Sequence, residues 1–470
     1  MSKVPIYLQI VHSIREKIYS GEWTIGSKLP TQREMAEQFQ VNRSTVITAI
    51  EILKAEGLLE SKYGSGIYVV NNQWSILTAT SQPNWNDISK WALHPPSDKS
   101  VQIINELETR KDIIQLSKGE LGSELFPRSE IALATEKVSG KLHDFGYGDG
   151  AGDIDLRKEI SKRLGKIGIS TSASGILIVS GALQGIQLIS QGVLKTGSTV
   201  FIESPSYLYS IYLFRSAGMK LKDISVKNNG FNIEELAKQK ILKNNSVIYL
   251  NPTYHNPTST LMPLKERNQL IKLCRYFHLP IIEDDIYRDL WIDEPAPPPL
   301  KALDTQGQVL YVGSFSKTVA AGLRIGWVVG PEVVIKRLSD LRMQIDYGSS
   351  YFSQAVVKEL LASGLYDRHL AKVREGLKER RDFMLNLLDY HLSEYATWIK
   401  PKGGFFIWVT LNKNVNIRKL FKQSLNSGVL INPGFIYNDN KPSIRLSFSF
   451  PGFNEMEKGV LIIKNLLKNM

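Results

Sequence analysis

Apolar residues in the first 70 positions recur at helical spacing and predict three helices. The first helix is indicated by four isoleucines at every fourth position, Ile6, Ile10, Ile14 and Ile18. A second helix should begin after Thr31, because Thr31 and Glu34 have the spacing of a capping box. A third helix should start at Asn42 as its N-cap and end at Gly57. Its buried stripe would consist of Val46, Ile50 and Leu53.

The stretch "LLESKYGSGIYVV" predicts a hairpin, with two short strands around the turn at residues 63–66. Helix, helix, short turn, helix and hairpin is the order of a winged helix-turn-helix, whose third helix enters the major groove of DNA. Arg43, Ser44 and Thr45 would project from that helix, and Arg33 would lie near the phosphate backbone. A lone surface arginine is usually only solvated, but the agreement of the whole element order favours DNA contacts.

After residue 70 the pattern changes twice. Periodicity fades from residue 71 to about residue 110, which predicts a linker with short docking pieces. From residue 111 to residue 470, short apolar runs alternate with helical stretches, which predicts an α/β domain with a mainly parallel sheet. Ligands of such sheets bind outside the carboxyl ends of the strands.

The residues at those strand ends form a coherent chemical set. They offer helix-terminal N–H groups for a phosphate, a stacking ring, an amide, a carboxylate, a phenol, hydroxyls, a guanidinium and a lysine. In chain order they are Gly181, Ala182, Tyr207, Asn256, Asp284, Tyr287, Ser314, Lys317 and Arg324. Each residue alone could be ordinary surface or packing, but agreement at five strand ends favours a pyridoxal phosphate site. The lysine would form the Schiff base and the carboxylate would pair with the pyridine nitrogen.

Other catalytic patterns fail on the sequence. "SFSK" has the S-x-x-K spacing of penicillin-binding enzymes, but "KTG" precedes it and no S-D-N triplet occurs. "PIIEDD" could be a magnesium-binding strand, but the phosphate-binding pattern G-x-x-x-x-G-K-[ST] is absent. Metal spacings such as C-x-x-C and H-E-x-x-H are also absent, so no metal site is expected.

Composition adds limits on location and partners. The net charge is +12, but residues 1–70 hold eight Lys/Arg and seven Asp/Glu, so placement and not bulk charge argues for DNA. The single cysteine, Cys274, suits a reducing cytoplasm and reads as a small apolar helix residue. No apolar run is long enough to span a membrane, and no signal peptide is recognisable. We therefore expect a cytoplasmic protein.

The N-terminal region resembles the GntR family of bacterial regulators. The shared motifs are "PIYLQI", "LPTQREMAEQF", "VNRSTV", "LKAEGLL" and "GSGIYVV", which cover nearly all of residues 4–70. The resemblance implies contacts with double-stranded operator DNA. The implied contact residues are Arg33, Arg43, Ser44, Thr45 and the wing glycine Gly64.

From about residue 110 onward the chain resembles a fold-type I, class I aminotransferase, with a smaller C-terminal α+β subdomain. The resemblance implies that Lys317 forms the internal aldimine and that Asp284 binds the pyridine nitrogen. It implies further cofactor contacts at Asn256, Tyr287, Tyr207, Ser314, Arg324 and the backbone of Gly181 and Ala182. Arg445 in "SIRLSFS" matches an arginine that grips a substrate carboxylate. Tyr147 matches a tyrosine that reaches the partner subunit's phosphate, so a homodimer is implied.

The order of the two parts resembles the MocR subfamily of bacterial regulators. We therefore expect a regulator that senses an amino acid, another amine or pyridoxal phosphate itself through Lys317. The alternative is a working aminotransferase with a tethering or autoregulatory DNA-binding domain, which the D-x-x-Y spacing in "EDDIYRDL" favours. Two departures affect loop geometry: Ser259 replaces a usual glycine, and Ala321 stands where proline is frequent.

Overall fold

The computed structural model describes most of the chain in two compact units, Met1–Pro95 and Pro96–Met470. The described residues are 5–62, 64–71, 85–90, 92, 94–140, 146–227, 230–239, 245–412 and 415–470. Tyr63 of the expected hairpin turn lies outside them, as do residues 72–84, 91 and 93 of the expected linker. The rest of that linker segment contains two helices, α5 (Trp85–Ser89) and α6 (Lys99–Leu107).

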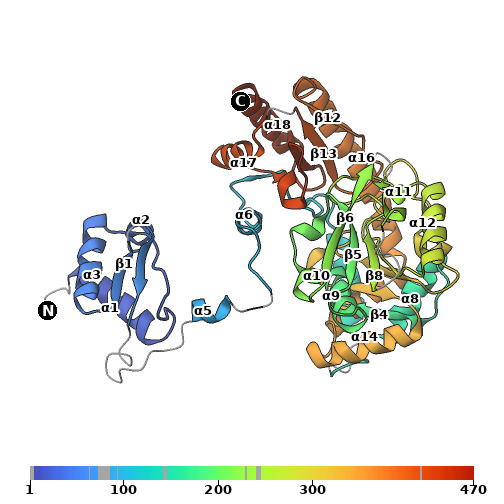
Figure 1. Ribbon diagram of the computed structural model, residues 1–470, viewed down its shortest axis with the longest axis horizontal. Helices are drawn as coiled ribbons and strands as arrows, with labels where there is room; N and C mark the ends of the chain where they lie inside the picture. The colour runs from blue at the N-terminus through green and yellow to red at the C-terminus, as the bar shows by residue number, and fades with distance from the viewer. Residues whose placement is uncertain are drawn as a thin grey trace. The chain divides into compact units, whose positions relative to one another are not determined.

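The first unit holds the predicted three helices and hairpin (Figure 1). Its elements are α1 (Ile6–Tyr19), α2 (Gln32–Gln38), α3 (Arg43–Ala55), β1 (Leu59–Lys62) and β2 (Gly66–Val69). The strands pair antiparallel, with Lys62 opposite Gly66. Thr31 forms the expected capping box, because its hydroxyl accepts from the Glu34 N–H while the Glu34 carboxylate accepts from the Thr31 N–H. Asn42 takes the N-cap position of α3 without a side-chain cap hydrogen bond.

The core of this unit is made by one face of each helix. Its buried members include Ile10, Ile14, Ile18, Met35, Val46, Ala49, Ile50 and Leu53. Ile6 departs from the predicted stripe, with 56% of its surface exposed. A four-residue step advances about 400° around a helix of 3.6 residues per turn, so the stripe drifts about 40° at each step. The drift carries Ile6 out of the core.

An eight-stranded sheet forms the centre of the second unit, in the order β4-β11-β10-β9-β8-β5-β6-β7. The strands are β4 (Ile176–Val179), β5 (Thr199–Ser204), β6 (Lys220–Lys227), β7 (Gly230–Phe231), β8 (Ser246–Leu250), β9 (Ile281–Asp284), β10 (Val309–Ser314) and β11 (Gly326–Val329). The run from β10 to β6 is parallel, as predicted. By contrast, β11 is antiparallel to both its neighbours, and β7 is antiparallel to β6.

Helices cover both faces of this sheet (Figure 1), because successive strand residues point to opposite sides. On one face, Leu177 and Val179 pack with α9 (Ala182–Gly192), α10 (Leu213–Ser216) and α14 (Glu332–Ile345). On the other, Ile176 and Ile178 pack with α7 (Arg128–Ser139), α8 (Ile154–Gly165) and α15 (Tyr351–Ala362). Farther along the sheet, the same second face is covered by α11 (Ile233–Ala237), α12 (Leu264–Phe277) and α13 (Leu300–Leu303).

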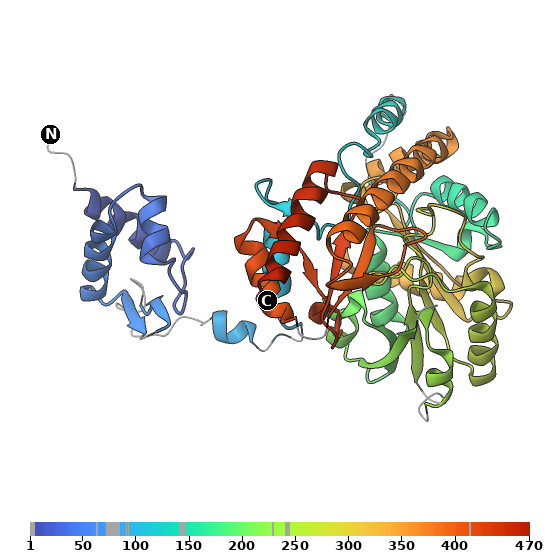
Figure 2. The same cartoon turned by 90° about the horizontal axis from the view of Figure 1, so that it is seen from above.

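The C-terminal part forms the expected α+β subdomain around a four-stranded sheet in the order β12-β13-β16-β15. Its strands are β12 (Ala396–Trp398), β13 (Phe406–Leu411), β15 (Asn432–Pro433) and β16 (Ser443–Ser447). Its helices are α16 (Leu365–His391), α17 (Ile417–Asn426) and α18 (Phe453–Lys468). Figure 2 shows these orange and red segments gathered beside the green strands of the large sheet. A short parallel pair, β3 (Ile114–Gln115) with β14 (Val429–Leu430), joins the chain just after the linker segment to the subdomain.

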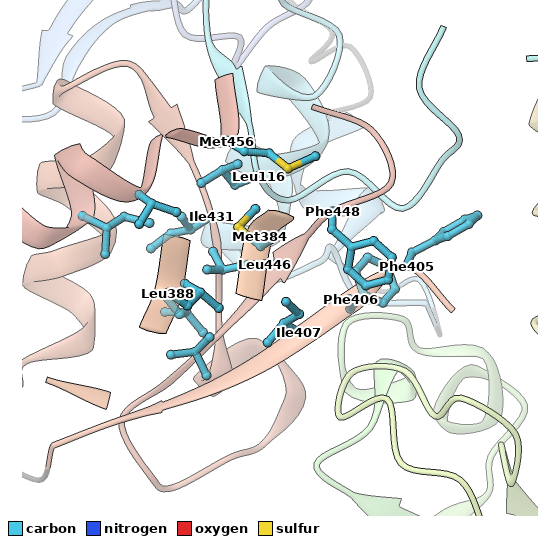
Figure 3. Packing of buried hydrophobic residues seen from close by; sticks show 14 of the residues in the cluster. Leu116, Met384, Leu388, Phe405, Phe406, Ile407, Ile431, Leu446, Phe448 and Met456 are labelled. Atoms are coloured by element: carbon cyan, nitrogen blue, oxygen red, sulfur yellow. The ribbon is translucent and has the colours of Figure 1, made fainter. Parts of the chain in front are cut away.

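The subdomain core brings together segments that are far apart in sequence (Figure 3). Met384 and Leu388 of α16 lie with Leu446 of β16 and with Leu116, which follows β3 directly. All four side chains are fully buried. The chain that emerges from the linker is therefore packed into the subdomain core.

Candidate functional site

A cavity of about 320 Å³ lies at the carboxyl ends of the parallel strands. Its walls bring together nine of the side chains singled out from the sequence. They are Ala182, Tyr207, Asn256, Asp284, Tyr287, Ser314, Lys317, Arg324 and Arg445. Eight follow or end strands β4, β5, β8, β9 and β10, and Arg445 comes from β16 of the subdomain. The parallel topology thus delivers these groups to one edge of the sheet.

Lys317 follows β10 and extends into this cavity. Its Nζ donates a hydrogen bond to the Gly119 carbonyl at 2.7 Å. The pKa of Lys317 is lowered to about 8, mainly because the amine is buried away from water; Arg445 also lowers it, while Glu120 and Glu108 oppose the change. The amine is therefore closer to its nucleophilic, uncharged form at neutral pH than a surface lysine is.

Asp284 is the last residue of β9 and lies buried in the cavity wall. The Tyr249 hydroxyl donates to its Oδ2 at 2.6 Å. Burial raises the pKa of the Asp284 carboxyl to about 6, against the opposing hydrogen bond from Tyr249. A buried carboxylate in this position is the partner that a protonated pyridine nitrogen requires.

A buried polar network holds the residues around Asp284. Asn251 donates from Nδ2 to the Asp284 carbonyl at 2.5 Å, and its Oδ1 accepts from the Asn256 N–H at 2.9 Å. The Asn251 N–H donates to Glu203 Oε2 at 2.7 Å, and His255 Nε2 lies 3.3 Å from the same oxygen. Burial raises the pKa of Glu203 to about 8 and lowers that of His255 to about 3. The Glu203–His255 pair is therefore uncharged near neutral pH, as a dry interior requires.

The start of α9 forms an anion cradle with Arg324. Gly181, the N-cap of α9, has a φ of 92°, and a Cβ atom there would lie 2.6 Å from Arg324 Nη2. Arg324 itself adopts a left-handed backbone (φ 55°), and its Nη2 donates to the Ser180 carbonyl at 2.8 Å. The hydroxyl of Ser316 is buried and has no hydrogen-bond partner within the described part of the chain. Helix-terminal N–H groups, a guanidinium and a free hydroxyl fit the phosphate of pyridoxal phosphate.

Arg445 closes the subdomain side of the cavity. Its guanidinium stacks on the Phe406 ring, with 3.8 Å between the guanidinium carbon and the ring centroid. Nη1 donates to Asn256 Oδ1 at 2.7 Å and Nη2 to the Ser117 carbonyl at 2.8 Å. Nε is buried without a partner in the described residues. A carboxylate could take up this planar donor set by replacing neutral oxygens.

The three tyrosines of the sequence prediction separate into two groups. Tyr207 and Tyr287 line the cavity, and the Tyr287 ring packs edge-on against Phe405, with centroids 5.6 Å apart. Tyr147 does not line the cavity of its own chain. It is 86% exposed, and its ring centroid lies 5.3 Å from that of Tyr347.

The residues expected to contact DNA lie on the surface of the first unit. Arg33, Arg43 and Thr45 surround one shallow hollow, and Ser44 is exposed at the start of α3. The Arg43 guanidinium is oriented by its neighbour Gln32, whose Oε1 accepts from Nε at 3.1 Å and from Nη2 at 2.9 Å. Gly64 turns the hairpin with a φ of 68°. None of these five residues belongs to the buried core of the first unit.

Comparison with known proteins matches the same two regions. Residues 6–69 match the gntR family of bacterial regulatory proteins, and residues 111–459 match the aminotransferase class I and II family. The HTH-type transcriptional regulator YdfD of Bacillus subtilis is 49% identical over 471 residues, covering 100% of this chain and 98% of its own length. The chain belongs to the MocR-type regulators. The HTH-type transcriptional regulator NorG of Staphylococcus aureus is 39% identical, covering 94% of this chain and 100% of its own.

The fold of the second unit also has a close solved counterpart. Kynurenine aminotransferase of Pyrococcus horikoshii, solved in complex with PMP, has a TM-score of 0.77 and 30% identity. It covers 82% of this chain and 99% of its own length. In the MocR-type chain the aminotransferase fold is therefore complete. Within the described residues, none of the helices is long and apolar enough to cross a membrane.

The first of the two departures from the aminotransferase pattern is explained by local geometry. Ser259, in place of the usual glycine, adopts the left-handed conformation (φ 58°) that glycine favours. Its hydroxyl donates to the Phe406 carbonyl at 2.7 Å, which offsets part of the backbone cost and links this loop to β13. Ala321 begins the short 3-10 turn Ala321–Leu323 that leads to Arg324.

Sequence reasoning missed several residues that shape the cavity. They are Glu108, Ser117, Gly119, Tyr249, Asn251, Phe406 and Tyr437. The alternation of side chains along a strand is enough to assign Tyr249 to one face of β8. It does not indicate that the Tyr249 hydroxyl binds Asp284. Gly119 and Ser117 act through backbone carbonyls, which no side-chain pattern reveals.

Proposed function

We propose that the protein is a pyridoxal-phosphate-dependent transcription regulator that binds operator DNA through α3. In this proposal the second unit holds the cofactor at Lys317 and senses an amino acid, another amine or the cofactor itself. The observation that carries the proposal is the meeting of Lys317, Asp284, Arg324 and Arg445 around one cavity, in a chain whose other unit exposes Arg43 on a recognition helix. Such a protein would work in the cytoplasm, where its operator lies.

Different residues of the cavity would bind different parts of the cofactor. Lys317 would bind it covalently, Asp284 would hold the pyridine nitrogen, and Tyr207 would stack on the ring. Asn256 and Tyr287 would face the ring hydroxyl. Gly181, Ala182, Ser314, Ser316 and Arg324 would hold the phosphate. The cofactor supplies an electron sink and a reactive carbonyl carbon for amines. The fit rests on the free Ser316 hydroxyl and on the space that only a glycine leaves beside Arg324.

Arg445 would select ligands that carry a carboxylate. At present its two Nη atoms donate to neutral oxygens, on Asn256 and on the Ser117 backbone. A carboxylate is a stronger acceptor than either and matches the guanidinium in bidentate geometry. This favours an amino acid over a simple amine as the ligand.

Sensing also requires that ligand binding reach the linker. Two carbonyls of the segment after β3, those of Ser117 and Gly119, accept hydrogen bonds from Arg445 and Lys317. A carboxylate on Arg445 and a cofactor on Lys317 would compete for these donors. The segment that receives the signal is the direct continuation of the linker from the DNA-binding unit. Ligand occupancy would thereby favour one arrangement of that segment, as a population shift requires.

A homodimer belongs to the same proposal. Tyr147 is almost fully exposed, beside Tyr347, which is 58% exposed. Tyr351 and Phe352 at the start of α15 are also exposed. Exposed aromatic side chains in such number are typical of protein–protein interfaces. In a dimer Tyr147 could reach the partner subunit's phosphate site.

An active aminotransferase is the second candidate function. The specific observation in its favour is Lys317 with a pKa of about 8, because such an amine can take up and return a proton near neutral pH. Asp284, Tyr287 and Arg445 are also in place around it. The two functions differ in whether a bound amine is turned over.

The test is a titration of the purified, cofactor-loaded protein with a panel of amino acids and amines, followed by a keto acid. Visible absorbance of the bound cofactor is the readout. A regulator should respond to one chemical class with a stable spectral change and no repeated turnover. Bleaching that the keto acid reverses over many cycles would instead establish the aminotransferase. Arg445→Gln should lose the response to amino acids and keep the response to amines, which separates the two ligand classes.

A further inference from the structure

One apolar side chain lies on the exposed face of α3. The buried face of this helix is made by Val46, Ala49, Ile50 and Leu53. The exposed face carries Ser44, Thr48 and Glu51, and among them stands Ile47 with 37% of its surface exposed. The side chain is not a member of the buried core cluster of the first unit. Its position one helical turn after Arg43 puts it on the face that would enter the major groove.

We propose that Ile47 reads the 5-methyl group of a thymine, beside a guanine that Arg43 reads. The proposal rests on the proposed function as a DNA-binding regulator and names the base sequence that its recognition helix selects. It makes Ile47 a specificity-determining residue of the DNA interface.

The chemistry of the major groove singles out thymine. Thymine presents a methyl group there, whereas cytosine presents a C5–H at that position and the purines present N7 and an exocyclic polar group. An isoleucine side chain gains by leaving water only against an apolar surface, and phosphate oxygens do not offer one. The thymine methyl is therefore the largest apolar feature that the major groove offers to Ile47.

Arg43 is oriented for guanine by Gln32. The Gln32 Oε1 accepts from Arg43 Nε and Nη2, which occupies one edge of the planar guanidinium. The edge formed by Nη1 and the second Nη2 proton stays available as a parallel pair of donors. Such a pair matches the O6 and N7 acceptors of guanine. Gln32 thus acts as a positioning residue that selects the edge presented to the base.

The spacing of the two side chains sets the spacing of the two bases. Arg43 and Ile47 are four residues apart, which corresponds to about 6 Å along the helix. Successive base pairs are about 3.4 Å apart. The guanine and the thymine should therefore lie within about two base pairs of each other in each half-site.

The experiment begins with selection of binding sites from random duplex DNA by the full-length protein. Each thymine of the selected site is then replaced singly by deoxyuridine, which removes only the methyl group. We expect one thymine in each half-site, within two base pairs of a guanine, to show about fourfold weaker binding, the value of one buried methyl group. In Ile47→Ala the thymine and deoxyuridine sites should bind equally.

Leu8→Ala is the matched control, because Leu8 is 39% exposed on α1 and lies outside the recognition helix. It should keep the full dependence on the thymine methyl. The proposal is overturned if no single deoxyuridine weakens binding, or if the methyl dependence persists in Ile47→Ala. Failure of the full-length protein to select any sequence would instead overturn the proposed function, so the two failures are distinguishable.

Discussion

The exposed face of α3 and the cavity around Lys317 differ in how far their charged groups are in contact with water. On α3, Arg43 and Ser44 are exposed, and the one conspicuous constraint is the hydrogen bonding of Arg43 to Gln32. In the cavity wall, Asp284 is buried and its pKa is raised to about 6, while that of Lys317 is lowered to about 8. The exposed face of α3 keeps its charged and polar groups in water. The titratable groups of the cavity, by contrast, lose their contact with water when the protein folds.

The difference teaches where each function is sensitive. Exposed groups cost little to maintain, so changes on α3 should alter DNA binding and leave folding unaffected. Buried groups are held by networks, such as the one that joins Asn251 to Asp284 and Glu203, and their replacement disturbs chemistry and stability together. The proposed ligand sensing would need the second kind of site, because pre-organised groups discriminate among small amines.

Lys317→Ala should give the largest effect, complete loss of cofactor attachment. The substitution removes the amine that would form the covalent bond to the cofactor, and it leaves the other residues of the cavity unchanged. Visible absorbance after incubation with pyridoxal phosphate is the measurement, with circular dichroism to verify folding. The exposed Lys336→Ala on α14 serves as control. An unchanged absorbance in Lys317→Ala would place the covalent site elsewhere.

Arg43→Ala should weaken operator binding by about 1–3 kcal/mol and relax sequence preference at one position. The loss arises because a bidentate contact to one base disappears. Arg337→Ala removes the same charge from an exposed site on α14 and should leave binding almost unchanged. Fluorescence anisotropy on matched and mismatched duplexes measures both. Equal weakening on every sequence would show that Arg43 contacts phosphate and not a base.

The fold shows which elements of the two units could be predicted from the sequence. The capping box at Thr31 and the apolar stripe of α3 are local, so they predicted the first unit almost completely. The antiparallel direction of β11 was not predicted, although only 11 residues and no crossover helix separate this strand from Ser314, the end of β10. A parallel return needs a longer crossover, so that short connection was the available clue.

The cavity was only partly readable, for a physical reason. Side chains at strand ends, such as Lys317 and Asp284, follow from topology alone, because parallel strands end at one edge. The acceptor for Lys317 is a backbone carbonyl 198 residues earlier, at Gly119. Contacts of that kind depend on how the subdomain packs against the sheet, and residue type does not encode them. The stacking of Arg445 on Phe406 was hidden in the same way.

The rate of cofactor uptake should depend on pH in a way that sharpens the contrast between buried and exposed groups. Below its pKa of about 8, the fraction of Lys317 in the reactive free-amine form rises tenfold with each pH unit, and above it the rise ends. An exposed lysine would continue to gain reactivity up to about pH 10.4. Stopped-flow absorbance of cofactor-free protein mixed with pyridoxal phosphate from pH 6 to 10 measures the profile. A rise that continues to pH 10 would contradict the buried environment of Lys317.

Thr31→Ala should have the smallest effect, a local destabilisation of about 1 kcal/mol in the first unit. The change removes the hydroxyl that accepts from the Glu34 N–H at 3.2 Å. Hydrogen exchange of the full-length protein should quicken in α2 and remain unchanged in the large sheet. Faster exchange in the sheet as well would mean that the two units are not independent in stability.

The central claim is that ligand binding in the cavity changes the affinity of the protein for operator DNA. A reciprocal binding experiment tests this claim most directly. Operator affinity of the full-length protein is measured with and without the amine that alters the cofactor spectrum, and amine affinity is measured with and without operator. Linkage predicts the same factor of change in both directions, and no effect of the amine on operator affinity in Lys317→Ala. Identical operator affinity with and without the amine would contradict the account and leave the cavity as an independent enzyme site.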